Sequence, residues 1–96
     1  MPQSNATVQT LHGSAYISRL CKHWSHRFDV TLTADEGRID FGDSKHCVLQ
    51  ALPDGISMEI HAPDQESLES LERVVVDHLL RMAKHDKPSD AVWTRR

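Results

Sequence analysis

Two cysteines and seven histidines are the side chains of this 96-residue sequence best suited to bind a metal or exchange electrons. Thiolate and imidazole are the usual zinc ligands and also suit copper and iron. Cys21 and His23 stand about 200° apart around a helix, so one ion does not readily take both. The alternatives left open are a transition-metal or thiol redox site built from Cys21, Cys47 and His78, and a disulfide between the two cysteines. The simpler interpretation is that both cysteines are small buried hydrophobic residues.

A row of aromatic and basic residues offers a second kind of chemistry. Because residues three or four apart share one face of a helix, the row predicts a polar flank that could contact a ligand. Guanidinium and protonated imidazole groups bind carboxylates and phosphates through charge-assisted hydrogen bonds. The alternative is an ordinary solvated helix face. The residues of this row are Tyr16, Arg19, His23, His26 and Arg27.

Hydrophobic residues at helical spacing place this row on a helix predicted over residues 15–27, with Ser14 as its N-cap. Trp24 is expected to anchor it in the core. The pattern then changes to alternation of apolar and polar residues, which is typical of strands with one buried face. Four such strands are predicted over residues 28–33, 38–41, 46–51 and 56–61.

A second helix is predicted over residues 65–85, with Asp64 as its N-cap. Weaker patterns predict short strands over residues 6–11 and 90–94, and residues 1–5 and 94–96 are expected to be frayed. The predicted fold is therefore one α+β domain over residues 1–96. It has an antiparallel four-stranded meander, two helices packed on one face, and short extra strands at both termini.

The other face of the sheet is predicted to be open unless a partner covers it. Among its charged residues, Arg38 and Asp40 are the positions most expected to contact a ligand. The simpler interpretation is that mixed charges form cross-strand pairs and keep the face soluble. Self-association through this face, giving a homodimer, is a further alternative. The ionisable residues predicted there are Asp29, Arg38, Asp40, His46, Glu59 and His61.

Composition excludes several classes of function. A formal net charge of −3 argues against a nucleic-acid partner. No apolar run approaches the roughly 18 residues of a membrane span, and no secretory signal is visible. Two cysteines fit free thiols in a reducing compartment, so we expect a cytoplasmic protein. Without a glycine-rich phosphate loop or a nucleophile elbow, the sequence predicts no enzyme and no cofactor.

The run from Tyr16 to Phe28, Tyr-Ile-Ser-Arg-Leu-Cys-Lys-His-Trp-Ser-His-Arg-Phe, resembles the signature of a small bacterial family, domain of unknown function 2218. Gly37-Arg38-Ile39-Asp40-Phe41-Gly42, Cys47-Val48-Leu49-Gln50-Ala51 and Val75-Val76-Asp77-His78-Leu79 resemble its further motifs. The resemblance covers about residues 12–93 and implies a bacterial, non-secreted domain. Similar domains occur joined to siderophore-interacting flavoproteins, which release iron from its chelator. The resemblance implies no catalytic residues, and the chain has no flavin or nicotinamide motif.

These observations predict a non-enzymatic accessory domain in bacterial iron-siderophore handling. It would bind a protein or a small anionic ligand through the flank of the first helix.

Overall fold

The computed structural model describes residues 2–83 and 87–95. These residues form two helices and one six-stranded antiparallel sheet, so the α+β class is confirmed. Residues 84 and 85, the predicted end of the second helix, lie outside the described residues, as do Met1 and Arg96. The elements in chain order are β1 (Gln3–Gln9), α1 (Gly13–Trp24), β2 (Asp29–Leu32), β3 (Glu36–Gly42), β4 (Lys45–Leu52), β5 (Gly55–His61), α2 (Gln65–Met82) and β6 (Thr94–Arg95).

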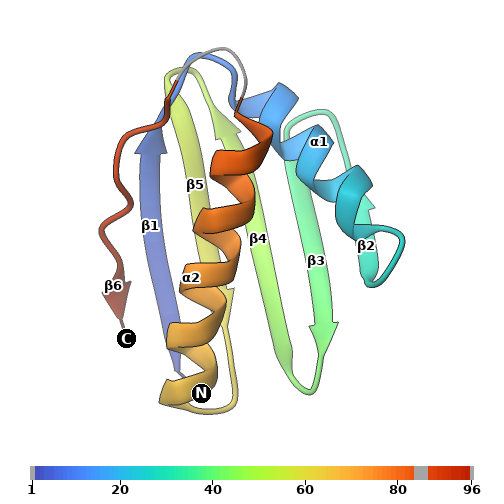
Figure 1. The fold of residues 1–96 in the computed structure, drawn as a ribbon, viewed down its shortest axis with the longest axis vertical. Helices are drawn as coiled ribbons and strands as arrows, with labels where there is room; N and C mark the ends of the chain where they lie inside the picture. The colour runs from blue at the N-terminus through green and yellow to red at the C-terminus, as the bar shows by residue number, and fades with distance from the viewer. Residues whose placement is uncertain (1, 84–86, 96) are drawn as a thin grey trace.

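The sheet has the strand order β2-β3-β4-β5-β1-β6 (Figure 1). Strands β2 to β5 are the predicted meander, but the sheet is wider than four strands. All seven residues of β1 pair with β5, and Thr94 and Arg95 pair with Asn5 and Ser4. The prediction of frayed residues 1–5 and 94–96 is therefore wrong for residues 3–5 and 94–95. Inward-facing Ser4, Ala6 and Val8 are buried, which stabilises β1 beside β5.

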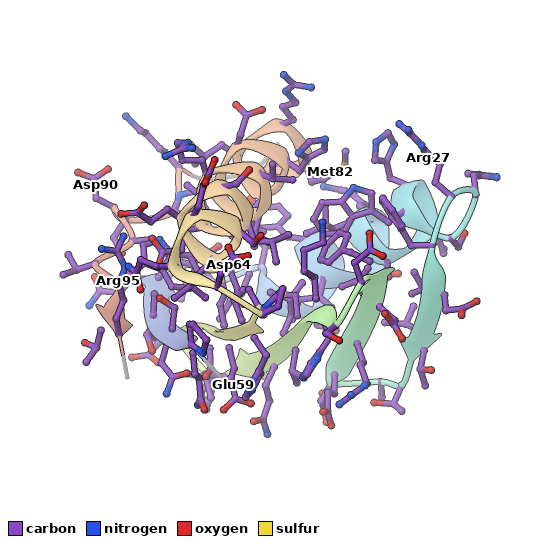
Figure 2. All side chains as sticks on the ribbon, turned by 90° about the horizontal axis from the view of Figure 1, so that it is seen from below. Arg27, Glu59, Asp64, Met82, Asp90 and Arg95 are labelled. Carbon is purple, nitrogen blue, oxygen red and sulfur yellow. The ribbon has the colours of Figure 1, made fainter. Side chains whose placement is uncertain are left out.

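Both helices cover the same face of the sheet, as predicted. Helix α1 packs on β2, β3 and β4, whereas α2 packs on β5 and β1. Seen along the sheet, the helices lie on one side and the other side carries only side chains (Figure 2). The core between the layers includes Ile17, Leu20, Trp24, Ile39, Leu49, Met58, Ile60, Leu68, Val75 and Leu79.

Helix α1 begins and ends earlier than predicted. Its N-cap residue is His12, and Ser14 instead donates its hydroxyl proton to the carbonyl of Ala34 at 3.1 Å. A Cβ atom at Gly13 would lie 2.7 Å from the carbonyl oxygen of Gly55, so only glycine allows the helix to begin this close to β5. At the other end, the amides of Arg27 and Phe28 both donate to the carbonyl of Trp24, and the chain turns away. Residues 25–27 are therefore a turn and not the last turn of the helix.

Helix α2 begins as predicted. The carboxylate of Asp64 accepts a hydrogen bond of 2.7 Å from the amide of Ser67, and this bond lowers the pKa of Asp64. The helix ends at Met82, and Ala83 takes an extended backbone conformation. Neither helix in the described part of the chain combines the length and apolar character that crossing a membrane requires.

Candidate functional site

The predicted binding flank does not form a single surface, because Tyr16 and Arg19 are used inside the fold. Tyr16 is fully buried, so its placement on the exposed flank is wrong. Tyr16, Leu20 and Trp24 recur every four residues, which puts the tyrosine on the buried stripe of α1. The guanidinium of Arg19 lies 5.9 Å from the Tyr16 ring and donates to the carbonyl of Met82 at 3.2 Å. Arg19 therefore caps the carbonyl end of α2.

The remaining members of the predicted flank gather where α1 ends. His23 is exposed in the last turn, and His26 and Arg27 are exposed in the following turn; Lys22, which was not part of the predicted flank, is exposed beside His23. We call these four residues the basic end of α1. Because the helix stops at Trp24, Arg27 does not continue the face of His23. Figure 2 labels Arg27 at this end, on the helix side of the sheet and away from Glu59.

The sequence itself carries a charge signal at this end. The first acidic residue of the chain is Asp29, so the charged side chains before it are all basic: Arg19, Lys22 and Arg27, with His12, His23 and His26 when protonated. This segment is strongly positive in a chain whose formal net charge is −3. A positive surface of this kind favours contact with an anion.

Arg27 and Asp40 both line a shallow hollow of about 440 Å³. The sequence predicted each of them to contact a ligand, Arg27 on the helix flank and Asp40 on the open sheet face. Phe28 and Phe41 line the hollow and pack edge to face, with ring centroids 4.9 Å apart. Asp29 also lines the hollow. Two carboxylates beside one guanidinium disfavour an anion in this hollow.

The two cysteines are buried and free of a disulfide. Cys21 packs against Gly37 of β3, where any larger residue would collide with its sulfur. Burial raises the pKa of the Cys21 thiol. Burial also raises the pKa of Cys47, and a charge on Cys21 would raise it further. Both groups therefore stay protonated at neutral pH, whereas metal binding and nucleophilic attack require the thiolate.

His78 does not complete a metal site with these cysteines. Its Nδ1 lies 2.8 Å from the carbonyl oxygen of Val74, and its ring packs on Trp24 at 5.3 Å between centroids. Among residues 2–83 and 87–95, no three His, Cys, Asp or Glu side chains are placed to hold a metal ion. The described structure therefore does not bring Cys21, Cys47 and His78 together around one ion. The arrangement agrees with the simpler interpretation, in which both thiols fill the core.

The open face of the sheet carries Arg38 and Asp40, both exposed, on either side of buried Ile39. From the sequence we expected the histidines of this face to be ordinary solubilising residues, but the strand register brings two of them together. His46 of β4 lies directly opposite His61 of β5, and their rings stack with centroids 4.4 Å apart and an angle of 14°. We call these two residues the histidine pair.

Acidic and amide groups surround the histidine pair. Asp40 lies opposite His46 on the neighbouring strand, and Gln3 lies opposite His61. A carboxylate oxygen of Glu59 lies 3.5 Å from Nε2 of His61, and its other oxygen accepts a 2.8 Å hydrogen bond from Gln3. Burial, His61 and Arg38 lower the pKa of His46, while Asp40 and Glu59 partly oppose that shift.

A sequence signal for this pair exists in the turn between its strands. Leu52 pairs with Gly55, so the hairpin loop is the two residues Pro53 and Asp54. Counting back from a two-residue loop pairs residue 46 with residue 61.

A buried acid that the sequence did not indicate joins the two chain termini. Glu72 of α2 accepts hydrogen bonds from Arg95 at 2.7 and 3.0 Å and from the hydroxyl of Ser4. Burial alone would raise the pKa of Glu72, but the hydrogen bonds from Arg95 and Ser4 hold it below its usual value. This contact fastens β6 and β1 to α2.

Comparison with known proteins places this architecture among bacterial domains. A family model described as an uncharacterized protein conserved in bacteria, domain of unknown function 2218, matches residues 5–94. The NMR structure of PA4090 from Pseudomonas aeruginosa is similar, with 44% sequence identity and a TM-score of 0.82 over 98% of this chain and 96% of that one. No curated protein matches the sequence.

Proposed function

The chain belongs to the bacterial family named domain of unknown function 2218, and we propose that it is a small non-enzymatic binding domain whose ligand presents an anionic group. The ligand binds at the basic end of α1. The observation that carries this proposal is the exposed cluster Lys22, His23, His26 and Arg27, which precedes the first acidic residue of the chain.

The charge balance at this end favours an anion over the simplest structural explanation. Basic residues often lie at the end of a helix because its dipole places about half a negative charge there. Lys22 and Arg27 supply two full positive charges, and His23 and His26 add more when protonated. Asp29 and Asp40 share the hollow with Arg27, so the charge available to a ligand comes chiefly from Lys22 and from His23 and His26 when protonated. A guanidinium also binds carboxylate or phosphate with paired hydrogen bonds.

A binding role fits the state of the thiols better than a catalytic one. A cysteine nucleophile needs a thiolate and access to its substrate. Cys21 and Cys47 are buried, and their pKa values are raised. The groups at the basic end are instead exposed bases that suit electrostatic contact.

We further propose that the ligand is an anionic ferric siderophore or the carboxylate-bearing surface of a protein that handles one. The support is the resemblance to domains joined to siderophore-interacting flavoproteins, together with the sign of the charge at the basic end.

An amide NMR titration of the full chain with an anionic ferric siderophore tests the proposal, with inorganic phosphate and citrate as simpler anions. We expect concentration-dependent shifts concentrated in residues 22–28. One exposed charge pair contributes about 0.2–1 kcal/mol, so the double variant K22Q/R27Q should weaken binding about two- to thirtyfold. Arg73 is exposed on α2, and R73Q provides a matched loss of charge. Equal affinity for K22Q/R27Q and R73Q, or no shifts in residues 22–28 with any of the anions, would contradict the proposal.

A further inference from the structure

The histidine pair lies on the open sheet face, on the opposite side of the sheet from the helices and from the basic end of α1. Antiparallel pairing places His46 and His61 directly opposite each other, on consecutive strands of one hairpin. In such a pair the Cβ atoms lie about 4.5–5.5 Å apart, so both imidazoles reach the same point above the sheet. The stacked rings, with centroids 4.4 Å apart, already occupy that common space.

The geometry permits a shared ion after a small movement. Metal–imidazole bonds are about 2.0–2.1 Å long, so two ring nitrogens on one ion stand about 3 Å apart. The rings must tilt from their nearly parallel stack to bring two nitrogens that close. Both side chains are half-buried at the surface of the sheet, where such a rotation meets solvent and not the core.

Carboxylates beside the pair can support a cation. Asp40 lies opposite His46 on β3, and a Glu59 oxygen lies 3.5 Å from Nε2 of His61. Arg38 acts against them and lowers the pKa of His46 more than either carboxylate raises it, so the carboxylate that supports a cation is Glu59 beside His61. Neutral imidazole is the form that binds metals, and the lowered pKa of His46 keeps it in that form near neutral pH.

We propose that His46 and His61 together bind one divalent transition-metal ion, with water completing its coordination shell. The described residues place no third His, Cys, Asp or Glu ligand around a common point, so the site is open and the ion exchangeable. Glu59 acts through His61: its carboxylate orients the imidazole and strengthens it as a ligand. This site is independent of the proposed anion site at the basic end.

The ligand set indicates which ions bind. Imidazole suits copper, nickel and zinc, whereas calcium and magnesium prefer oxygen ligands. Among divalent first-row ions at a given site, copper binds most tightly. Cu²⁺ is therefore the sharpest probe, and Zn²⁺ should bind the same pair more weakly.

Titration of the full chain, prepared without a histidine tag, with CuCl₂ tests the site. We expect one strongest site per chain and an electron paramagnetic resonance spectrum with coupling from two imidazole nitrogens. Sub-stoichiometric Cu²⁺ should broaden the ring signals of His46 and His61 before those of the other histidines. These two readouts use the wild-type protein, so they do not depend on the folding of any variant.

Variants then assign the ligands. H46Q and H61Q should each weaken Cu²⁺ binding at least tenfold, and E59Q should weaken it less. The double variant H23Q/H26Q removes two exposed histidines from the basic end and should leave the strongest site unchanged. An unchanged affinity in H46Q and H61Q, or first broadening at His23 and His26, would overturn the proposal. Neither result would bear on anion binding at the basic end.

Discussion

The basic end of α1 and the histidine pair both contain two histidines, yet their surroundings favour opposite ligands. At the basic end, His23 and His26 stand beside Lys22 and Arg27 in a segment without acids. In the histidine pair, the imidazoles stand beside the carboxylates of Asp40 and Glu59. We therefore propose an anion for the first surface and a cation for the second, because neighbouring charges influence which partner an imidazole supports.

The two regions also differ in how they are assembled. The basic end consists of residues 22–27, a continuous segment whose charge is visible in the sequence. The histidine pair depends on the register of β4 and β5, and a slip of one residue would turn one histidine toward the core. A local cluster survives small changes of structure, whereas a cross-strand pair is only as reliable as the pairing that holds it.

The largest expected effect comes from Tyr16→Ala, which tests whether the tyrosine belongs to the core and not to the basic surface. Tyr16 is fully buried, and truncating a large buried aromatic side chain costs about 3–5 kcal/mol of the free energy of unfolding. Urea denaturation followed by circular dichroism measures this loss. Y16F keeps the ring and should cost much less. A stable Y16A protein with weakened anion binding would return Tyr16 to the binding surface.

A smaller effect is expected for Glu72→Gln. This variant tests whether the buried carboxylate of Glu72 holds β1 in place, the strand that pairs with β5 beside His61. Gln3 of β1 contacts Glu59 on the open face, while Ser4 beside it holds Glu72 on the core face. Weakening the contacts of Glu72 to Arg95 and Ser4 should cost about 1–3 kcal/mol at pH 7. Hydrogen exchange should quicken in β1 and β6 and stay unchanged in α1.

The pH dependence of this loss follows from the lowered pKa of Glu72. The carboxylate stabilises the folded state fully above its unfolded pKa of about 4.3. That contribution is lost as the pH falls through the lower folded pKa. Urea unfolding at pH 7, 4 and 3 should therefore show the wild-type advantage over E72Q shrinking with acid. E66Q, at the exposed first turn of α2, is the matched control. A gap between wild type and E72Q that stays constant with pH would contradict this account.

The smallest effect is expected for His46→Gln, which sharpens the contrast in histidine environment. Because burial, His61 and Arg38 lower the pKa of His46, the unfolded chain takes up its proton more readily than the folded one. Stability should therefore fall as the pH drops below about 6.5, the unfolded histidine pKa. In H46Q the free energy of unfolding should fall less with acid than in the wild type. This difference should be smaller than the loss of unfolding free energy that E72Q causes at pH 7. Unfolding curves at pH 7.5, 6 and 5 measure it, and identical slopes in both proteins would contradict the lowered pKa.

Local patterns predicted much of the fold because each depends on few residues. The cap at Asp64, the apolar stripe of α1 and the alternation in β4 and β5 follow from spacing alone. The predicted end of α1 was wrong because Phe28 continues the helical spacing of apolar residues. In the structure the chain turns after Trp24, and Phe28 then packs on Phe41. Tyr16 was misplaced because a tyrosine at the edge of an apolar stripe is compatible with either face.

The candidate surfaces show the same division. The sequence by itself determined the positive charge of residues 1–28, the helix that ends among those bases and the hairpin that carries His46 and His61. Only the tertiary structure decided that Tyr16 is buried in the core, that Arg19 caps the end of α2, that Glu72 joins both termini and that two histidines stack. Composition and spacing act along the chain, whereas burial and pairing depend on which distant segments pack together.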